Sequence, residues 1–140
     1  MEWWFILALL SAFFAALVAI LAKVGLQGVD SNVATAMRSI IMALFVIAFI
    51  AYLGKLNQLT QITGKDMVFI ILSGIAGAAS WLCYFAALRL ADASKVAPID
   101  RASVLMVLVL AALFLGEKIT LKTAAAGVLV FLGVLLLALK

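Results

Sequence analysis

Apolar residues are arranged along the chain in five long runs, which short polar connections separate. Each run comes close to the roughly 20 residues that an α-helix needs to cross the hydrocarbon core of a bilayer. The pattern therefore predicts an all-α polytopic membrane protein, a bundle of five transmembrane helices that forms a single domain over residues 1–140. The expected helices cover about residues 3–24, 33–53, 67–90, 96–115 and 123–139.

The start of the chain has the features of a membrane helix rather than of a cleaved leader. Trp3 and Trp4 precede the first apolar run, and Trp is enriched where membrane helices meet water. A basic segment and a clear small-residue cleavage site, which secretory signal peptides carry, are both missing from this run. We therefore expect it to remain in place as the first helix.

Composition supports the membrane class and excludes several functions. Hydrophobic residues make up 69% of the chain and charged residues 11%, against roughly 45–50% and 25% in soluble domains. The sequence has no histidine and one cysteine, Cys83, so histidine-based catalysis and an intrachain disulfide are excluded. Paired acids, catalytic motifs and metal-ligand clusters are also missing, so we expect no enzyme, no metal and no cofactor. The net charge of +4 forms no basic strip, so we expect no nucleic-acid partner.

Charged residues inside the apolar runs are the candidates for function. Pro98 lies in the first turn of the predicted fourth helix, where proline costs least, and Asp100 and Arg101 follow it. Charges in membrane helices are costly and usually face a cavity or a partner. Because successive spans alternate in direction, Lys23 and Arg38 should reach the same side. These residues predict either a vestibule for an anionic or zwitterionic solute, gated by Asp100 with Arg38 or Arg101, or a structural ion pair and snorkelling cations.

Other residues are candidates by their spacing on helix faces. Trp81 and Tyr84 share a face of the predicted third helix, and Ser103 shares a face with Asp100. The aromatic rings would either line a solute path or pack against neighbouring helices. Small residues allow membrane helices to approach closely. The glycines expected to serve such packing are Gly74, Gly77, Gly127 and Gly133.

The positive charges choose an orientation only weakly. With five spans, four of the ten Lys and Arg residues fall on one side of the membrane and six on the other. Leaving out Lys23, Arg38 and Arg101, which lie partly within helices, gives four against three. Since cytoplasmic loops normally carry a clear excess, the chain inserts either in one orientation or in both. Two oppositely oriented copies would form an inverted repeat, as in many transporters.

Several short motifs follow one another in a characteristic order, and the most recognisable is the turn Gly116-Glu117-Lys118. The others are Ala86-Ala87-Leu88, Ala93, Ser94-Lys95-Val96-Ala97-Pro98-Ile99-Asp100-Arg101, Leu115, Ile119-Thr120, Gly127 and Gly133, with Lys23, Gly25 and Arg38 earlier in the chain. Together they resemble the EamA domain of the drug/metabolite transporter superfamily, most of all its stand-alone five-helix bacterial and archaeal members. The resemblance implies transport of small metabolites, typically by ten-helix proteins made of two inverted five-helix halves.

We therefore expect a transporter subunit in the cell membrane of a prokaryote, with a small-molecule solute and the bilayer as partners. It would act by alternating access as a homodimer, in parallel or antiparallel arrangement. One alternative is proton-coupled efflux of cationic drugs, with Asp100 as the proton carrier. Another is a non-transporting membrane subunit for assembly or partner binding.

Overall fold

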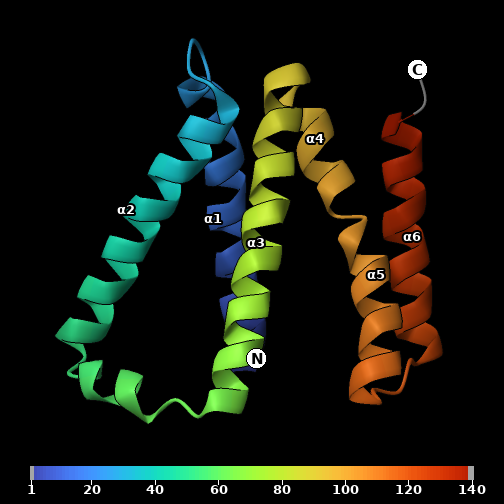
Figure 1. The fold of residues 1–140 in the computed structure, drawn as a ribbon. Helices are drawn as coiled ribbons and strands as arrows, with labels where there is room; N and C mark the ends of the chain where they lie inside the picture. Colours follow the sequence, from blue (N-terminus) through green and yellow to red (C-terminus); the bar gives the residue numbers. More distant parts are fainter. Residues whose placement is uncertain (1, 139–140) are drawn as a thin grey trace. The chain divides into compact units, whose positions relative to one another are not determined.

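The computed structural model describes residues 2–138, and all regular structure in that range is helical (Figure 1). This confirms the predicted all-α membrane class. The elements are α1 (Trp3–Gly25), α2 (Ser31–Tyr52), the 3₁₀-helix η1 (Leu56–Gln61), α3 (Gly64–Leu90), α4 (Ala93–Asp100), α5 (Ser103–Leu110), the π-helix η2 (Ala111–Leu115) and α6 (Leu121–Ala138).

Four stretches are long and apolar enough to cross a membrane. They are α1, α2, α3 and Ala93–Leu115, the last of which comprises α4, α5 and η2. The apolar helix α6 is shorter. Its 18 residues span about 27 Å, slightly less than the roughly 30 Å of a bilayer core. The predicted end of the fifth helix, Leu139, lies outside the described residues.

The helices form two compact units. The α2–α3 unit comprises Val24–Leu90. The α4–α6 unit comprises Met1–Lys23 and Ala91–Lys140, so it also contains α1.

In the α2–α3 unit, two long helices run in opposite directions and pack against each other. Asp30 caps the start of α2, where its Oδ1 accepts hydrogen bonds from the backbone N–H of Asn32 (2.8 Å) and Val33 (3.3 Å). Gly54, with φ of +68°, ends α2 in a conformation that favours glycine. The two helices approach near the start of α2 and the end of α3, and they diverge toward η1 (Figure 1).

In the α4–α6 unit, the predicted fourth helix is broken, which corrects the expectation of one helix over residues 96–115. Because α4 begins at Ala93, Pro98 is its sixth residue and not part of its first turn. Proline has no N–H for the carbonyl of Ser94, and its ring crowds that carbonyl. After Asp100 the backbone hydrogen bonds therefore span three residues instead of four. They run from Arg101 N to Pro98 O (3.0 Å) and from Ala102 N to Ile99 O (2.9 Å).

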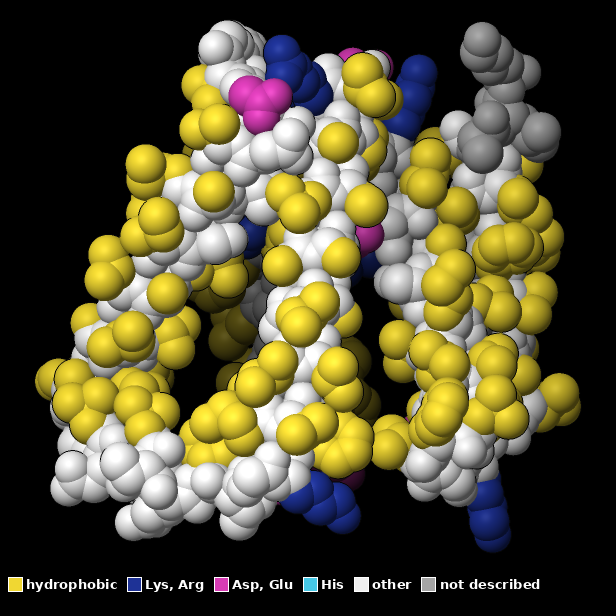
Figure 2. All heavy atoms as spheres, viewed as in Figure 1, with side chains coloured by type: hydrophobic (Ala, Val, Ile, Leu, Met, Phe, Trp, Pro, Cys, Tyr) yellow, Lys and Arg dark blue, Asp and Glu magenta, His cyan; other side chains and the backbone are white. Residues whose placement is uncertain are grey.

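Very few hydrophobic side chains are buried among the described residues. The six that are buried are Ala19, Leu26, Phe85, Leu88, Val96 and Val134. Figure 2 shows hydrophobic side chains over most of the visible helix surfaces, with Lys and Arg mainly near the helix ends. Soluble monomers rarely expose apolar surface on this scale, so lipid or protein must cover these helices.

Candidate functional site

The central feature of the α2–α3 unit is a cation stacked on an aromatic ring. The Cζ atom of Arg38, on α2, lies 3.6 Å from the centroid of the Trp81 ring, on α3. The same atom lies 5.6 Å from the centroid of Phe85. Both separations fall within the roughly 6 Å range of cation–π attraction. The structure therefore brings together two of the predicted path residues, Arg38 and Trp81.

Three aromatic side chains of α3 form the platform under this cation. Trp81 and Tyr84 meet edge to face with centroids 5.5 Å apart, and Trp81 and Phe85 do so at 5.9 Å. Phe85 is buried, with 3% of its surface exposed, and the Arg38 guanidinium of α2 lies near its ring. Phe85 was not singled out from the sequence. Its position four residues after Trp81 places it on the same helix face, which is the signal that could have found it.

Arg38 lies about two turns from the start of α2 and is half-buried. It is seven residues beyond Ser31, the first residue of α2, which corresponds to about 10 Å along the helix axis. Two hydroxyls beside it are already used: Thr35 Oγ1 donates to Ser31 O (2.7 Å) and Ser39 Oγ donates to Thr35 O (2.9 Å). Within the described part of the chain, no hydrogen bond or ion pair of Arg38 is found.

An ion pair joins α2 and α3 at their adjoining ends. Arg89 Nη1 lies 3.3 Å from Asp30 Oδ2, and both side chains are half exposed. The two backbone N–H groups at the start of α2, and then the Arg89 charge, lower the pKa of Asp30. Exposed pairs of this kind are screened by solvent, so the pair links the two helix ends but is a minor source of stability. Asp30 was not predicted as a site residue, although an Asp before an apolar run is a typical helix-start signal.

The remaining charged candidates lie in the α4–α6 unit. Lys23 Nζ donates a hydrogen bond to the backbone carbonyl of Ala91 (2.9 Å), so Lys23 ties the end of α1 to the chain just before α4. Asp100 and Arg101 are exposed where α4 ends, and Ser103 begins α5. The face that was predicted to carry Asp100 and Ser103 together is interrupted by the turn between them. Arg38 and Asp100 fall in different units, so their pairing as a gate stays a prediction.

One of the four predicted packing glycines has a neighbour in close contact. A Cβ atom on Gly127 of α6 would lie 2.6 Å from Leu108 Cδ1 of α5, so the absence of a side chain lets these helices approach. For Gly74, Gly77 and Gly133, no such neighbour lies within 4 Å among residues 2–138. Their packing role stays a prediction, for a neighbour outside the chain.

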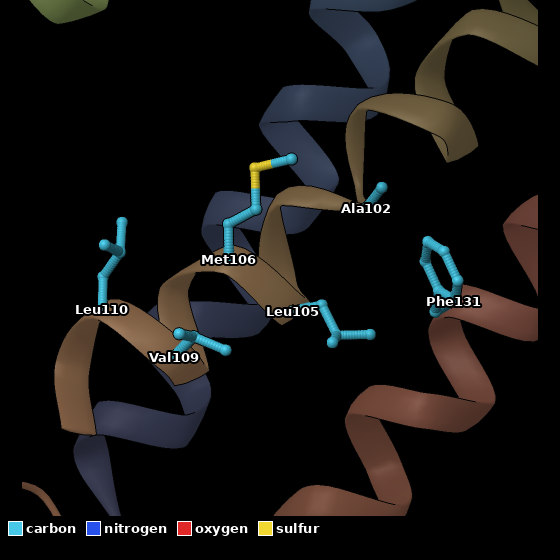
Figure 3. A pocket seen from close by; sticks show the side chains of 6 residues that line it. All are labelled: Ala102, Leu105, Met106, Val109, Leu110 and Phe131. Carbon is cyan, nitrogen blue, oxygen red and sulfur yellow. The ribbon is translucent and has the colours of Figure 1, made fainter. Parts of the chain in front are cut away.

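An apolar pocket of about 480 Å³ lies between α5 and α6. In Figure 3, Leu105 of α5 extends toward α6, which contributes Phe131. All lining residues are apolar: Ala102, Leu105, Met106, Val109, Leu110 and Phe131. Solute sites need a few polar groups to orient the ligand, so this pocket suits a hydrocarbon chain better than a metabolite. No cluster of metal-ligating side chains is found among the described residues.

Comparison with known proteins identifies the family. Residues 2–139 match the EamA-like transporter family. A Sinorhizobium sp protein, described as an uncharacterized transporter in the cobO 3' region, is 43% identical over 135 residues, which cover 96% of each chain. No solved structure matches the chain. The chain therefore belongs to the EamA-like transporter family of multi-pass membrane proteins.

Proposed function

We propose that this chain is one half of a transporter for small metabolites, and that two oppositely oriented copies form the path and work by alternating access. The observation that carries the proposal is the Arg38 guanidinium stacked on Trp81 inside a pair of membrane-spanning helices. A charge at this depth needs water, a counter-charge or a ligand. A solute path supplies water and a ligand, whereas a solidly packed structural bundle supplies neither.

Two observations support a second copy. Gly74 and Gly77 give α3 a surface of small residues, and among the described residues no neighbouring atom lies within 4 Å of a Cβ built on either glycine. Such surfaces mediate helix association in lipid. The weak charge bias between the two sides permits insertion in both orientations. Two inverted copies would reproduce the repeat that the wider superfamily builds within one chain, as the sequence resemblance implies.

Within the proposed path, each candidate has a role. Trp81 and Tyr84 form the wall beside Arg38. Asp100, with Arg38 or Arg101, forms the gate, and Ser103 lies beside it where the fourth span resumes. Pro98 causes the interruption that gives this span a hinge, and Lys23 holds the preceding connection.

Water access tests the path directly. In a Cys83→Ser background, single cysteines replace Trp81, Tyr84 or Ser103, and each variant is treated with a water-soluble thiol reagent in membranes. The matched control is Phe45→Cys, because Phe45 on α2 is 73% exposed and we expect this apolar surface to face lipid. The proposal predicts modification at 81, 84 and 103 and protection at 45. Equal protection at all four positions would favour a non-transporting subunit.

A further inference from the structure

We infer that Arg38 binds an oxyanion group, a carboxylate or a phosphate, of the transported solute. The inference rests on the proposed function, because it assigns a substrate class to the proposed path. Arg38, Trp81 and Phe85 are the residues that carry it.

Arg38 has no counter-charge close to it within its own unit. The α2–α3 unit contains two acids, Asp30 and Asp66. Asp30 is engaged by two backbone N–H groups and by Arg89, and it precedes Arg38 by eight residues, about 12 Å of helix. Asp66 is fifteen residues from Trp81 along α3, or about 22 Å. Neither carboxylate is placed to neutralise Arg38.

The hydrogen-bond donors of Arg38 are also available. A guanidinium carries five N–H groups in one plane and no acceptor. A Cζ-to-centroid distance of 3.6 Å is the contact distance of a guanidinium lying against the ring face. A guanidinium stacked in this way directs its N–H groups outward along the edge of the ring. No acceptor for them is found among the described residues, so the edge is available to a ligand.

An oxyanion fits these donors better than a cation does. The fork of a guanidinium matches the two oxygens of a carboxylate or phosphate, and both hydrogen bonds are then charge-assisted. The aromatic platform holds the fork in place and reduces the conformational freedom lost on binding. A cationic solute would instead meet an uncompensated positive charge. The site therefore favours anionic or zwitterionic metabolites over cationic drugs.

Binding is measured with the full chain through Trp81 itself. The sequence has three tryptophans, so Trp3→Phe and Trp4→Phe leave Trp81 as the only one. The purified protein, in a detergent without phosphate, is titrated with inorganic phosphate, with malonate and with tetraethylammonium, while sodium chloride holds the ionic strength constant. We expect a saturable change in Trp81 fluorescence with at least one oxyanion and none with the cation.

Variants assign the response to Arg38. In Arg38→Gln the apparent Kd should rise about tenfold or more, since hydrogen bonds between charged groups are lost. In Arg38→Lys, which keeps the charge and loses the fork, we expect an intermediate rise. Arg89→Gln is the matched control, because Arg89 is a cation of the same unit that is engaged by Asp30, and it should leave the Kd unchanged. An equal response in Arg38→Lys and the parent chain, or no response to either oxyanion, would overturn the inference.

Two further comparisons distinguish a lipid headgroup from a soluble anion, and the anion site from the transport path. If only added phosphatidylglycerol changes the fluorescence, while the soluble oxyanions and a phosphate-free glycolipid do not, Arg38 binds a lipid headgroup and the inference about the solute is wrong. If oxyanions bind but the cysteines at 81, 84 and 103 stay protected, the anion site stands and the transport path fails. If those cysteines are modified but no oxyanion binds, the path stands and its substrate is not anionic.

Discussion

The two units of this chain use the same apolar composition in different ways. The α2–α3 unit is held together by interactions of charged and aromatic side chains, namely the Arg38 stack on Trp81 and the pair between Arg89 and Asp30. The described interactions between helices of the α4–α6 unit are mainly apolar: α6 packs on α4 and α5, and Gly127 allows the closest approach. The first unit therefore contains the charged and aromatic contacts, whereas the second contains an interrupted span and an apolar pocket.

The difference matters because lipid removes the hydrophobic drive that would hold these helices together in water. Helix association in a membrane depends on close packing and on polar contacts. The α2–α3 unit relies on polar contacts, and the α4–α6 unit relies on close packing. Substitutions that remove a charge should therefore disturb the two units unequally, as should substitutions that fill a gap.

The largest effect is expected from filling the gap at Gly127. A Cβ would already press on Leu108 Cδ1 at 2.6 Å, and that terminal methyl can rotate away, so Gly127→Ala should be tolerated better than Gly127→Leu. The larger side chain should force α5 and α6 apart and destabilise the protein by about 1–3 kcal/mol. The measurement is thermal unfolding of the purified protein, followed by the loss of its monodisperse elution peak.

Gly133→Leu serves as the control for that substitution, because nothing lies within 4 Å of a Cβ built on Gly133. Gly133→Leu should leave the unfolding temperature of the isolated chain nearly unchanged. Equal destabilisation by the two substitutions would contradict the assignment of the α5–α6 contact to Gly127.

A smaller effect is expected from removing the platform under Arg38. Trp81→Leu keeps an apolar side chain but removes the aromatic face, which should cost about 1 kcal/mol of cation–π attraction. Trp81→Phe keeps a ring in place and should lose only part of that amount. Phe45→Leu is the comparison at an exposed ring with no cation contact. If Phe45→Leu lowers the thermal stability as much as Trp81→Leu, the stack contributes nothing of its own.

The smallest effect concerns the pH dependence of the Asp30 cap. The folded state lowers the pKa of Asp30, chiefly through the backbone N–H groups of Asn32 and Val33. The stabilisation is therefore complete above the ordinary pKa of an aspartate, about 4, and disappears as the pH falls through the lowered value. Asp30→Asn should melt earlier than the parent chain at pH 6, and the difference should shrink below about pH 4. A difference that stays constant with pH would show that the charge of Asp30 has no part in the cap.

The all-α membrane class could be predicted from the sequence, because length and hydropathy alone decide whether a segment suits a bilayer. The structure starts α2 at Ser31 and α3 at Gly64, two and three residues before the predicted starts. Both helices begin with polar or small residues, and the hydropathy pattern assigns such residues to the connections.

The interior geometry was less predictable. Arg38 and Trp81 were both candidates, yet their contact was not foreseen, because helices that are apolar on nearly every face give little indication of their rotation about the axis. The break after Asp100 was missed for a different reason. It depends on where α4 begins relative to Pro98, and helix boundaries are the least certain part of a sequence pattern.

The orientation of the chain in the membrane shows whether two oppositely oriented copies can form the path. In a Cys83→Ser background, single reporter cysteines replace Gln27, in the connection before α2, or Gln58, in η1. Both side chains are exposed, and α2 separates them. Each variant is treated with a membrane-impermeant thiol reagent on intact cells and again after permeabilisation. For two oppositely oriented copies, we expect partial labelling from outside at both positions. The two labelled fractions should together approach the labelling found after permeabilisation. Complete labelling at one position and none at the other would contradict it.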